Sequence, residues 1–530
     1  MNHLLLLGDE AIAQGALDAG LSGVYAYPGT PSTEITEYIQ ASPLAKERAV
    51  HSAWSVNEKT AVEEALGMSF AGKRALVCMK HVGLNVAADG FMNAAMTGVN
   101  GGLIVLAADD PSMHSSQNEQ DSRFYGKFAM IPIFEPSSQQ EAYDMMFEAF
   151  DLSEKFETPV LLRITTRMAH SRSGVVRREP RALNSLSLPE DERRFILLPA
   201  NARGRYKRLL RLQDQFSVAS AHSAFNQVYP GSDNTLGIIA CGIAYNYLME
   251  CYGGAPSPHT VIKVSQYPAP IEPIAQLFDT CKKVLVLEEG YPFLEEQLKG
   301  ILPCGPAVSG RLDGTIPRDG ELNPNLVAKA LGMPLPELLS APSLMVNRPP
   351  ALCKGCGHSD TFNALNQALA QLGGGKVFGD IGCYTLGALP PYNSLHTCVD
   401  MGASVTMAKG AADAGVHPSV GVIGDSTFTH SGMTGLLDCV LEQTPVTIII
   451  ADNSTAAMTG GQHSSAFGIL EKICLGLGVE QAHIKVLKPL PKHLDENREV
   501  LRNELNYKGV SVVIFQRECV QVAARRVRNK

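Results

Sequence analysis

Several signatures of specialised protein classes are absent from this sequence. No apolar run reaches the ~18 residues that a membrane-spanning helix requires, so we expect no membrane association. The net charge is −8 over 530 residues, which provides no overall positive field and argues against a nucleic-acid-binding protein. Basic residues gather at 203–211 and at the C-terminus, and we interpret both runs as solvated helix faces or tails.

A secretion signal is also missing from the start of the chain, MNHLLLLGDE. Its apolar stretch consists of four leucines, which favours a first β-strand over a signal peptide. We therefore expect a cytoplasmic protein, in which disulfides are disfavoured. The composition, with 45% hydrophobic residues and 48 glycines, is typical of a globular α/β protein. The length suggests about three domains.

Short apolar runs alternate with helix-like stretches in three regions of the chain. This alternation is typical of βαβ units on a parallel sheet, so we expect an α/β fold with three doubly wound domains. A polar, basic segment with one or two helices separates the first two regions, and a proline-rich stretch at 333–351 separates the last two. The predicted domains and connecting segments are, in order, 1–185, 186–234, 235–340, 345–522 and a basic tail at 523–530.

In the third region, polar side chains follow two consecutive buried strands. Asp425 follows the run SVGVIG, and Asn453 follows VTIIIAD 28 positions later. Because ligands bind beyond the carboxyl ends of parallel strands, both side chains should reach one crevice. A carboxylate, an amide oxygen and a neighbouring backbone carbonyl, which we assign to Thr455, suit Mg²⁺ with phosphate and water in its other positions. The sequence therefore predicts a site for a metal-bound diphosphate.

The same stretch resembles the thiamine-diphosphate motif, which begins with Gly-Asp-Gly and ends in Asn. Gly424, Asp425 and Asn453 match this motif, whereas Ser426 replaces its second glycine. Gly-Asp turns and Asp-Asn loops also occur without any cofactor, so the spacing alone leaves both interpretations open.

Thiamine chemistry also requires a carboxyl group hydrogen-bonded to the aminopyrimidine ring. In thiamine enzymes this glutamate opens a helix that continues with small residues, and the stretch NEKTA at 57–61 looks like such a helix start. Glu58 is therefore the predicted catalytic carboxyl group. The alternative is an exposed glutamate that the helix dipole favours at this position.

Five longer stretches narrow the resemblance to one family. They are YPGTPSTEI (27–35), DDPSMHSSQNEQDSR (109–123), TPVLLRITTRMAHSR (158–172), CKGCGH (353–358) and DIGCYTLG (380–387). In this order they closely resemble the large, alpha subunit of indolepyruvate ferredoxin oxidoreductase, in the 2-oxoacid:ferredoxin oxidoreductase superfamily. The resemblance covers nearly all of residues 4–520. The family's C-terminal ferredoxin-like domain, with its runs of closely spaced cysteines, is expected to be absent because the sequence stops at Lys530.

The resemblance implies a reaction, cofactors and partners. The reaction is the oxidative decarboxylation of an aromatic 2-oxoacid, similar to indolepyruvate, to its acyl-CoA. The implied cofactors are thiamine diphosphate, Mg²⁺ and a 4Fe–4S cluster, with coenzyme A as co-substrate and ferredoxin or a similar carrier as electron acceptor. A small beta subunit is the implied partner, and a dimer of the alpha chain is expected. Regions 1–185 and 345–522 correspond to the pyrimidine-binding and diphosphate-binding domains, and 235–340 resembles a transketolase C-terminal domain.

Four of the twelve cysteines match the cluster ligands that the resemblance implies. Cys353 and Cys356 form a CxxC turn, and Cys383 and Cys519 each follow a strand, so all four are expected at one edge of a sheet. In this order they resemble the proximal 4Fe–4S ligands of the superfamily's thiamine-binding subunits, and such a cluster requires thiolates. A zinc site that includes the CxxC pair, or plain buried thiols, are the alternatives.

Contacts with the substrate follow partly from the resemblance. Thr30, in the PGTPST turn, matches the superfamily threonine near the reacting centre, and His358 flanks the cofactor motif. Arg123 and Arg167 are candidates to bind a substrate carboxylate through a bidentate fork. A surface salt bridge is the alternative for each arginine.

Two other functions stay open on the sequence. A non-oxidative thiamine-dependent 2-oxoacid decarboxylase would keep the cofactor and omit electron transfer. The expected absence of the ferredoxin-like domain favours this function, and the four cysteines oppose it. A non-catalytic assembly subunit that retains the fold is the second alternative, and the presence of Glu58, Asp425 and Asn453 opposes it.

Overall fold

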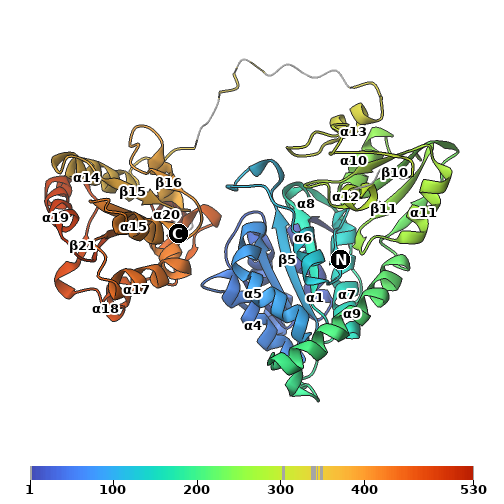
Figure 1. The fold of residues 1–530 in the computed structure, drawn as a ribbon, viewed down its shortest axis with the longest axis horizontal. Helices are drawn as coiled ribbons and strands as arrows, with labels where there is room; N and C mark the ends of the chain where they lie inside the picture. The colour runs from blue at the N-terminus through green and yellow to red at the C-terminus, as the bar shows by residue number, and fades with distance from the viewer. Residues whose placement is uncertain (1–2, 301–304, 336–341, 343, 347–349, 529–530) are drawn as a thin grey trace. The chain divides into compact units, whose positions relative to one another are not determined.

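The computed structural model describes residues 3–300, 305–335, 342, 344–346 and 350–528. The chain divides into two compact units, unit 1 (Met1–Leu339) and unit 2 (Ser340–Lys530) (Figure 1). The predicted proline-rich boundary at 333–351 lies partly outside the described residues.

A seven-stranded sheet forms the centre of the first predicted region. In sheet order its strands are β12 (Gln266–Tyr267), β6 (Ile133–Phe134), β7 (Val160–Thr165), β5 (Leu103–Asp109), β4 (Ala75–Lys80), β2 (Gly23–Ala26) and β3 (His51–Trp54). β12 pairs antiparallel with β6, and the other neighbours pair parallel. Because β12 belongs to the second predicted region, the first two regions share a sheet edge and lie in one compact unit.

Helices cover both faces of this sheet, because alternate strand residues point to opposite sides. Leu76 and Leu106 pack into one apolar cluster, and their neighbours Val77 and Val105 pack into another. Helices α4 and α5 contribute to the second cluster and lie side by side (Figure 1). The helices of this part are α1 (Gly8–Asp18), α2 (Thr33–Ala41), α3 (Pro43–Glu47), α4 (Glu58–Phe70), α5 (His81–Thr97), α6 (Arg123–Ala129), α7 (Gln139–Phe156) and α8 (Thr166–His170).

The predicted first strand is present, but it lies outside the seven-stranded sheet. β1 (His3–Leu7) pairs antiparallel with β8 (Arg172–Val176) in a separate two-stranded sheet. An apolar run indicates a strand from its own residues, whereas the choice of partner depends on distant parts of the chain.

The second predicted region forms a five-stranded sheet. In sheet order its strands are β14 (Ala307–Ser309), β13 (Lys283–Leu287), β10 (Asp233–Cys241), β11 (His259–Val264) and the antiparallel edge strand β9 (Gln227–Tyr229). Its helices are α10 (Ala244–Cys251), α11 (Ile271–Thr280), α12 (Phe293–Lys299) and α13 (Pro324–Ala330).

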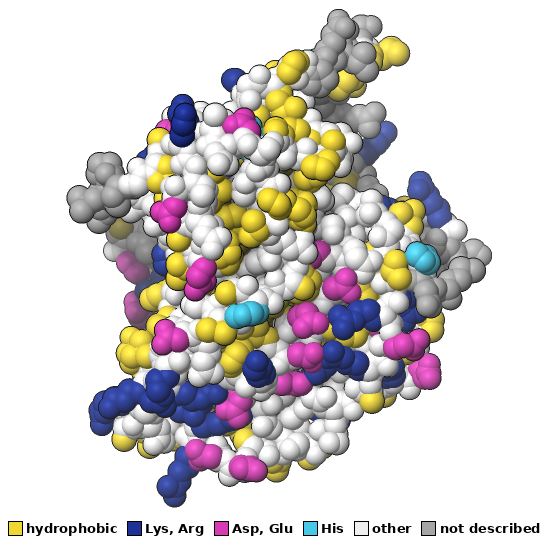
Figure 2. Space-filling model, turned by 90° about the vertical axis from the view of Figure 1, so that its right-hand side faces the viewer, with side chains coloured by type: hydrophobic (Ala, Val, Ile, Leu, Met, Phe, Trp, Pro, Cys, Tyr) yellow, Lys and Arg dark blue, Asp and Glu magenta, His cyan; other side chains and the backbone are white. Residues whose placement is uncertain are grey.

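The predicted linker contains one long helix, α9 (Pro199–Ala221). It buries Leu212 and Phe216 against Phe156, while Arg203 and Lys207 of the basic run are exposed. Figure 2 shows one face of the protein, on which a group of basic side chains gathers at the lower left, with acidic side chains beside it.

Unit 2 contains a six-stranded sheet in which all neighbouring strands are parallel. In sheet order its strands are β16 (Thr397–Cys398), β15 (Lys376–Gly379), β17 (Ser419–Gly424), β18 (Thr447–Asp452), β22 (Ser511–Gln516) and β21 (Ile484–Leu487). One face carries α14 (Gly357–Gln371) and α19 (Leu494–Asn506), and the other carries α15 (Ala403–Asp413), α17 (Met433–Leu441) and α18 (Leu470–Gly476). Shorter elements are α16 (Asp425–Thr427), β19 (Thr455–Ala456) and β20 (Gln462–His463).

Residues 523–528 of the predicted basic tail belong to a final helix, α20 (Val520–Arg528), and the last two residues lie outside the described part of the chain. The fold class predicted from the sequence is confirmed, because helices cover both faces of mainly parallel sheets. Within the described part of the chain, no helix has the length and apolarity needed to cross a membrane.

Candidate functional site

The two predicted strand-end residues lie at the same edge of the unit 2 sheet. β17 and β18 are parallel neighbours, with Gly424 opposite Ala451. Asp425 starts the short helix α16 directly after β17, and Asn453 follows β18. A π-helical turn follows α16, at Phe428–Gly432, and such turns are frequent at functional sites.

Asp425 is a buried carboxylate that the chain leaves incompletely paired. Its side chain is 3% exposed, and its Oδ2 atom has no hydrogen-bond partner among the described residues. Burial and, to a smaller extent, the nearby carboxylate of Asp452 raise the pKa of Asp425 to about 7. A buried charge without a partner is costly, and a bound cation removes that cost. Asp425 therefore fits a metal ligand.

Asn453 is held by contacts on both its side chain and its backbone. Its Oδ1 accepts a hydrogen bond from the Thr455 amide at 3.2 Å, and its Nδ2 donates to His358 Nε2 at 3.5 Å. Its backbone carbonyl accepts from the Cys519 amide at 3.2 Å. The Thr455 hydroxyl donates to the Gln462 carbonyl at 2.8 Å, and the backbone carbonyl of Thr455 stays a predicted Mg²⁺ ligand.

His358 lies at the start of α14 and is 5% exposed. Burial lowers the pKa of His358 to about 4, so the imidazole is neutral at pH 7. A neutral imidazole can accept the hydrogen bond from Asn453, and this contact orients the Asn453 amide.

Two residues beside this edge were not predicted. Tyr384 packs on Gly424 so closely that a Cβ atom at Gly424 would lie 2.7 Å from its ring. The Tyr384 hydroxyl donates to Asp380, whose Oδ2 accepts from the Gly402 amide at 3.0 Å and from Ser404 Oγ at 2.7 Å. Burial raises the pKa of Asp380 to about 6. Both residues belong to the DIGCYTLG stretch, in which the cysteine alone was interpreted.

The four predicted cluster cysteines line one cavity of about 230 Å³. The cavity wall also includes His358, Asn453 and Arg517, so it adjoins the strand-end residues. The cysteines that line it are Cys353, Cys356, Cys383 and Cys519. Cys353 is exposed and the other three are partly buried. None of the eleven described cysteines is in a disulfide.

These thiols influence one another electrostatically. Burial and, to a smaller extent, the thiols of Cys519, Cys356 and Cys353 together raise the pKa of Cys383 to about 12. The pKa of Cys356 is also raised, mainly by burial and additionally by the thiols of Cys353 and Cys519. Metal binding would have to displace protons from this set.

The spacing of the thiols distinguishes between the predicted metal sites. A tetrahedral zinc site with Zn–S bonds of about 2.3 Å holds its sulfur atoms about 3.8 Å apart. Among the described residues, three or more potential ligand atoms lie within 4.8 Å of one another only at Asp9, Glu34 and His170. The cysteines are therefore more widely spaced than a single zinc ion requires. Among the described residues the thiols thus form no preassembled metal site, and the four-iron cluster stays a prediction.

In unit 1, Thr30 and Glu58 follow two neighbouring strands. β2 and β3 are parallel and adjacent, so the PGTPST turn and the start of α4 lie at one sheet edge. Asn57 caps α4 by accepting from the Thr60 amide at 2.9 Å. Glu58 is 6% exposed, and Gly83 makes room for it, because a Cβ atom there would lie 2.5 Å from Glu58 Oε1. Sequence reasoning missed this role of Gly83.

Lys80 is a further polar residue at this edge that was not predicted. It ends β4, the other neighbour of β2. Lys80 packs closely on Gly29, because a Cβ atom added at Gly29 would lie 3.3 Å from the Lys80 Cβ. Its Nζ donates to Ser115 Oγ at 2.8 Å and lies 3.7 Å from Asp110 Oδ2. Burial lowers the pKa of Lys80 to about 8.

Arg123 lies in a buried ionic network. It is 0% exposed, and it donates to Asp121 Oδ1 at 2.9 Å and to Glu288 Oε2 at 3.0 Å. Arg163, also 0% exposed, donates to Asp109 Oδ2 at 2.7 Å in the same network. The carboxylates raise the pKa of Arg123 against the effect of burial. This arrangement favours a structural role for Arg123 over the predicted contact with substrate.

Arg167 forms the surface salt bridge that was its alternative role. Its Nε and Nη2 donate to the two oxygens of Glu321 at 2.9 and 2.7 Å, and its side chain is 43% exposed. The bidentate fork predicted for a substrate carboxylate is therefore occupied by Glu321.

Two family descriptions match separate parts of the chain. Residues 14–203 match the thiamine-diphosphate-binding domain of pyruvate flavodoxin/ferredoxin oxidoreductases. Residues 380–515 match the C-terminal domain of thiamine pyrophosphate enzymes, which binds that cofactor. The first match includes Thr30 and Glu58, and the second includes Asp425 and Asn453. The two matches together define a protein with two thiamine-diphosphate-binding domains, of the kind found in 2-oxoacid oxidoreductases.

Curated relatives match nearly the whole chain. A protein of Archaeoglobus fulgidus named indolepyruvate oxidoreductase subunit IorA is 39% identical, over 99% of this chain and 88% of the relative. A protein of the same name from Methanothermobacter thermautotrophicus is 37% identical, over 98% of this chain and 87% of the relative. The chain therefore belongs to the indolepyruvate oxidoreductase IorA family of 2-oxoacid:ferredoxin oxidoreductases, as the sequence motifs predicted.

A solved structure supports the fold. It is the 2-oxoglutarate:ferredoxin oxidoreductase from Magnetococcus marinus with 2-oxoglutarate, coenzyme A and succinyl-CoA bound. The TM-score is 0.51 at 17% identity, and the match covers 62% of this chain and 65% of the solved one. This similarity confirms the architecture.

Proposed function

We propose that this chain catalyses the oxidative decarboxylation of an aromatic 2-oxoacid, similar to indolepyruvate, to its acyl-CoA. The carboxylate leaves as CO₂, coenzyme A takes the acyl group and loses its thiol proton, and two electrons pass singly to a 4Fe–4S cluster and on to ferredoxin. One observation carries the proposal. The four thiols line the same cavity as Asn453 and His358 of the cofactor edge.

Asp425, Asn453 and the backbone carbonyl of Thr455 are the proposed Mg²⁺ ligands. Gly424 and Ser426, which flank Asp425, are the proposed neighbours of the diphosphate. When bound, thiamine diphosphate supplies the carbon nucleophile for the keto group and accepts the electrons that remain when CO₂ departs. Asp425 supplies negative charge to the cation, and His358 fixes the Asn453 amide through the 3.5 Å hydrogen bond.

Glu58 is the proposed acid–base group for the aminopyrimidine ring. Its burial at a capped helix start restricts its side chain, and Gly83 leaves the space that it occupies. Thr30, at the adjacent strand end, is the proposed contact near the reacting centre. Because Arg123 and Arg167 are already paired with carboxylates, either one would have to exchange its partner in order to bind a substrate carboxylate.

The thiols of Cys353, Cys356, Cys383 and Cys519 are the proposed cluster ligands. Their position in the wall of the Asn453 cavity would place the electron acceptor beside the cofactor. The subunit names of the IorA relatives support a partner subunit. The solved 2-oxoglutarate:ferredoxin oxidoreductase, with coenzyme A bound, supports ferredoxin and coenzyme A as further components. We also propose a dimer of the alpha chain, as the resemblance to the superfamily implies.

A single-turnover experiment under anaerobic conditions tests this function. Protein supplied with thiamine diphosphate and Mg²⁺ is mixed with indolepyruvate, phenylpyruvate or 2-oxoglutarate, and cluster reduction is followed by electron paramagnetic resonance. Indolepyruvate should give the fastest reduction. Glu58→Gln should abolish reduction while iron content stays unchanged, because the variant lacks only the acid–base group.

The other functions give different results. A non-oxidative decarboxylase would release CO₂ and the aldehyde without reducing any iron. A non-catalytic assembly subunit would bind no thiamine diphosphate in the presence of Mg²⁺. Faster reduction with 2-oxoglutarate than with either aromatic acid would contradict the proposed substrate class.

A further inference from the structure

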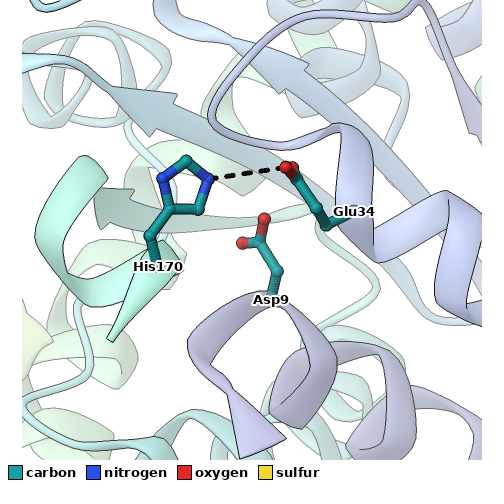
Figure 3. Close-up of side chains that lie close together, drawn as sticks. All are labelled: Asp9, Glu34 and His170. Atoms are coloured by element: carbon teal, nitrogen blue, oxygen red, sulfur yellow. Dashed lines mark ion pairs between the residues drawn. The ribbon is translucent and has the colours of Figure 1, made fainter. Parts of the chain in front are cut away.

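Three potential metal ligands converge in unit 1, outside the proposed catalytic set. They are Asp9 at the start of α1, Glu34 in the first turn of α2 and His170 at the end of α8 (Figure 3). One ligand atom from each lies within 4.8 Å of the other two. His170 Nε2 is 3.7 Å from Glu34 Oε1. The site thus draws on three helices that are distant in the sequence.

The two carboxylates of this group are incompletely paired, because His170 faces only Oε1 of Glu34. Asp9 is 0% exposed, and neither of its oxygens has a hydrogen-bond partner among the described residues. Glu34 Oε2 is also buried without one. Figure 3 shows the Asp9 carboxylate directed into the space beside the Glu34–His170 ion pair. Three unpaired carboxylate oxygens around one point are expected to attract a cation.

We propose that Asp9, Glu34 and His170 bind one divalent cation of the kind that accepts both imidazole and carboxylate ligands, such as Mn²⁺ or Zn²⁺. Ligand atoms about 2.1 Å from one ion lie roughly 3–4 Å from each other, which the 3.7 Å contact satisfies. Three protein ligands leave the remaining positions to water. The His170 side chain is 36% exposed, which provides a path for entry.

The cation would fix the turn that carries Thr30. Glu34 lies one turn of chain beyond Thr30, and the same turn is tied together by local hydrogen bonds. The Gly29 amide donates to Thr33 Oγ1 at 3.0 Å, and Ser32 Oγ donates to the Gly29 carbonyl at 2.8 Å. A cation on Glu34 would anchor this turn to α1 and α8. We assign it a structural role.

The alternative to a bound cation is a proton shared between the carboxyl groups of Asp9 and Glu34. Burial raises the pKa of Asp9 well above its usual range, and Glu34 and Glu10 raise it further. The pKa of Glu34 is lowered, mainly by its hydrogen bond to His170. In a metal-free chain, Asp9 would then hold a proton. Asparagine mimics a protonated aspartate but is a poor replacement for a carboxylate ligand, so Asp9→Asn separates the two arrangements.

Manganese binding to the full chain tests the proposal. Mn²⁺ is the probe because the cavity thiols compete for Zn²⁺. An Asp425→Asn background without thiamine diphosphate removes the proposed Mg²⁺ site. One tightly bound Mn²⁺ per chain is expected, with a rise of several degrees in the melting temperature. Both effects should vanish in Asp9→Asn and His170→Gln. They should persist in Glu37→Gln, which alters an exposed carboxylate on the same helix.

Spectroscopy on the chain with an intact site keeps the test decisive if a variant fails to fold. The electron spin echo of bound Mn²⁺ should show modulation from one histidine nitrogen. No tight Mn²⁺ binding, or bound Mn²⁺ without nitrogen modulation, would overturn the proposal. If Asp9→Asn leaves stability unchanged, and Mn²⁺ raises the melting temperature of neither the variant nor the parent protein, the shared proton is established instead.

Discussion

Units 1 and 2 each contain a buried set of charged or ionisable groups. The two sets differ in how many of these groups have a hydrogen-bond or ion-pair partner within the chain. In unit 1, Arg123 and Arg163 are 0% exposed and donate to buried carboxylates. In unit 2, Asp425 is 3% exposed with one oxygen that has no partner among the described residues, and Cys383 lies beside thiols that raise its pKa. A buried network in which the protein's own groups pair every charge contributes to folding. A buried set that contains unpaired polar atoms indicates a binding site for a ligand.

The largest effect on stability should follow from breaking the complete network. Arg123→Met leaves Glu288 without its cation and Asp121 with Arg163 alone, at 3.8 Å. Removing one partner of a buried ion pair costs about 3–5 kcal/mol. Denaturant unfolding of unit 1 should show this loss. Arg167→Met is the matched control, because its exposed salt bridge contributes only ~0–1 kcal/mol. A raised KM with unchanged stability in Arg123→Met would restore its predicted substrate role.

Changing the incomplete set should impair binding and leave folding intact. Asp425→Asn removes the charge that the proposed Mg²⁺ requires, so thiamine diphosphate affinity should fall by more than the ~100-fold typical of losing an outer-shell partner. Calorimetric titration with Mg²⁺ present measures this loss. Asp438→Asn, at an exposed position in the same unit, is the control. Equal affinity in both variants would contradict the proposed metal ligand.

The pH dependence of stability should report the unpaired carboxyl group directly. The pKa of Asp425 is about 7 in the folded chain and about 3.9 when unfolded, so between these values the folded state holds a proton that the unfolded state has lost. Stability of the cofactor-free protein should therefore fall as pH rises, by on the order of 1 kcal/mol per unit, and level off above pH 7. Asp425→Asn should remove this contribution, and the slope that remains below about pH 6 comes from other buried carboxyl groups such as Asp380. Identical slopes in the two proteins would contradict the account.

The smallest effect is expected at Tyr384, which borders the cofactor edge but belongs to a completed network. Tyr384→Phe removes the donor to Asp380 Oδ1, whereas the Gly402 amide and the Ser404 hydroxyl still donate to Oδ2. The unfolding free energy of unit 2 should decrease by about 1–3 kcal/mol. Thermal unfolding with and without cofactor measures it. A larger loss of cofactor affinity than of stability would show that Tyr384 contacts the ligand.

The sequence predicted the parts of the site that depend on strand order. β17 and β18 are consecutive in this sheet and adjacent in space, so apolar runs ending in Asp425 and Asn453 were sufficient to place both residues together. The four cysteines were located by the same argument, since each lies near a strand end or a helix start. Their ligand roles and that of Glu58 stay predictions.

The remaining features depend on contacts between distant segments. Arg123 reaches Glu288, 165 residues away, and no local pattern distinguishes such an arginine from one that binds substrate. Asp9, Glu34 and His170 each have an ordinary place at a helix end, and only the packing of three helices brings them together. The edge strand β12 likewise joined two predicted domains into one unit.

The most direct test of the central claim is the iron and acid-labile sulfide content of anaerobically purified protein. The claim predicts about four of each per chain. Both should fall sharply in Cys519→Ala and remain in Cys398→Ala, whose exposed thiol lies outside the cavity wall. Protein that binds thiamine diphosphate but contains no iron would contradict the electron-transfer site and favour the non-oxidative decarboxylase.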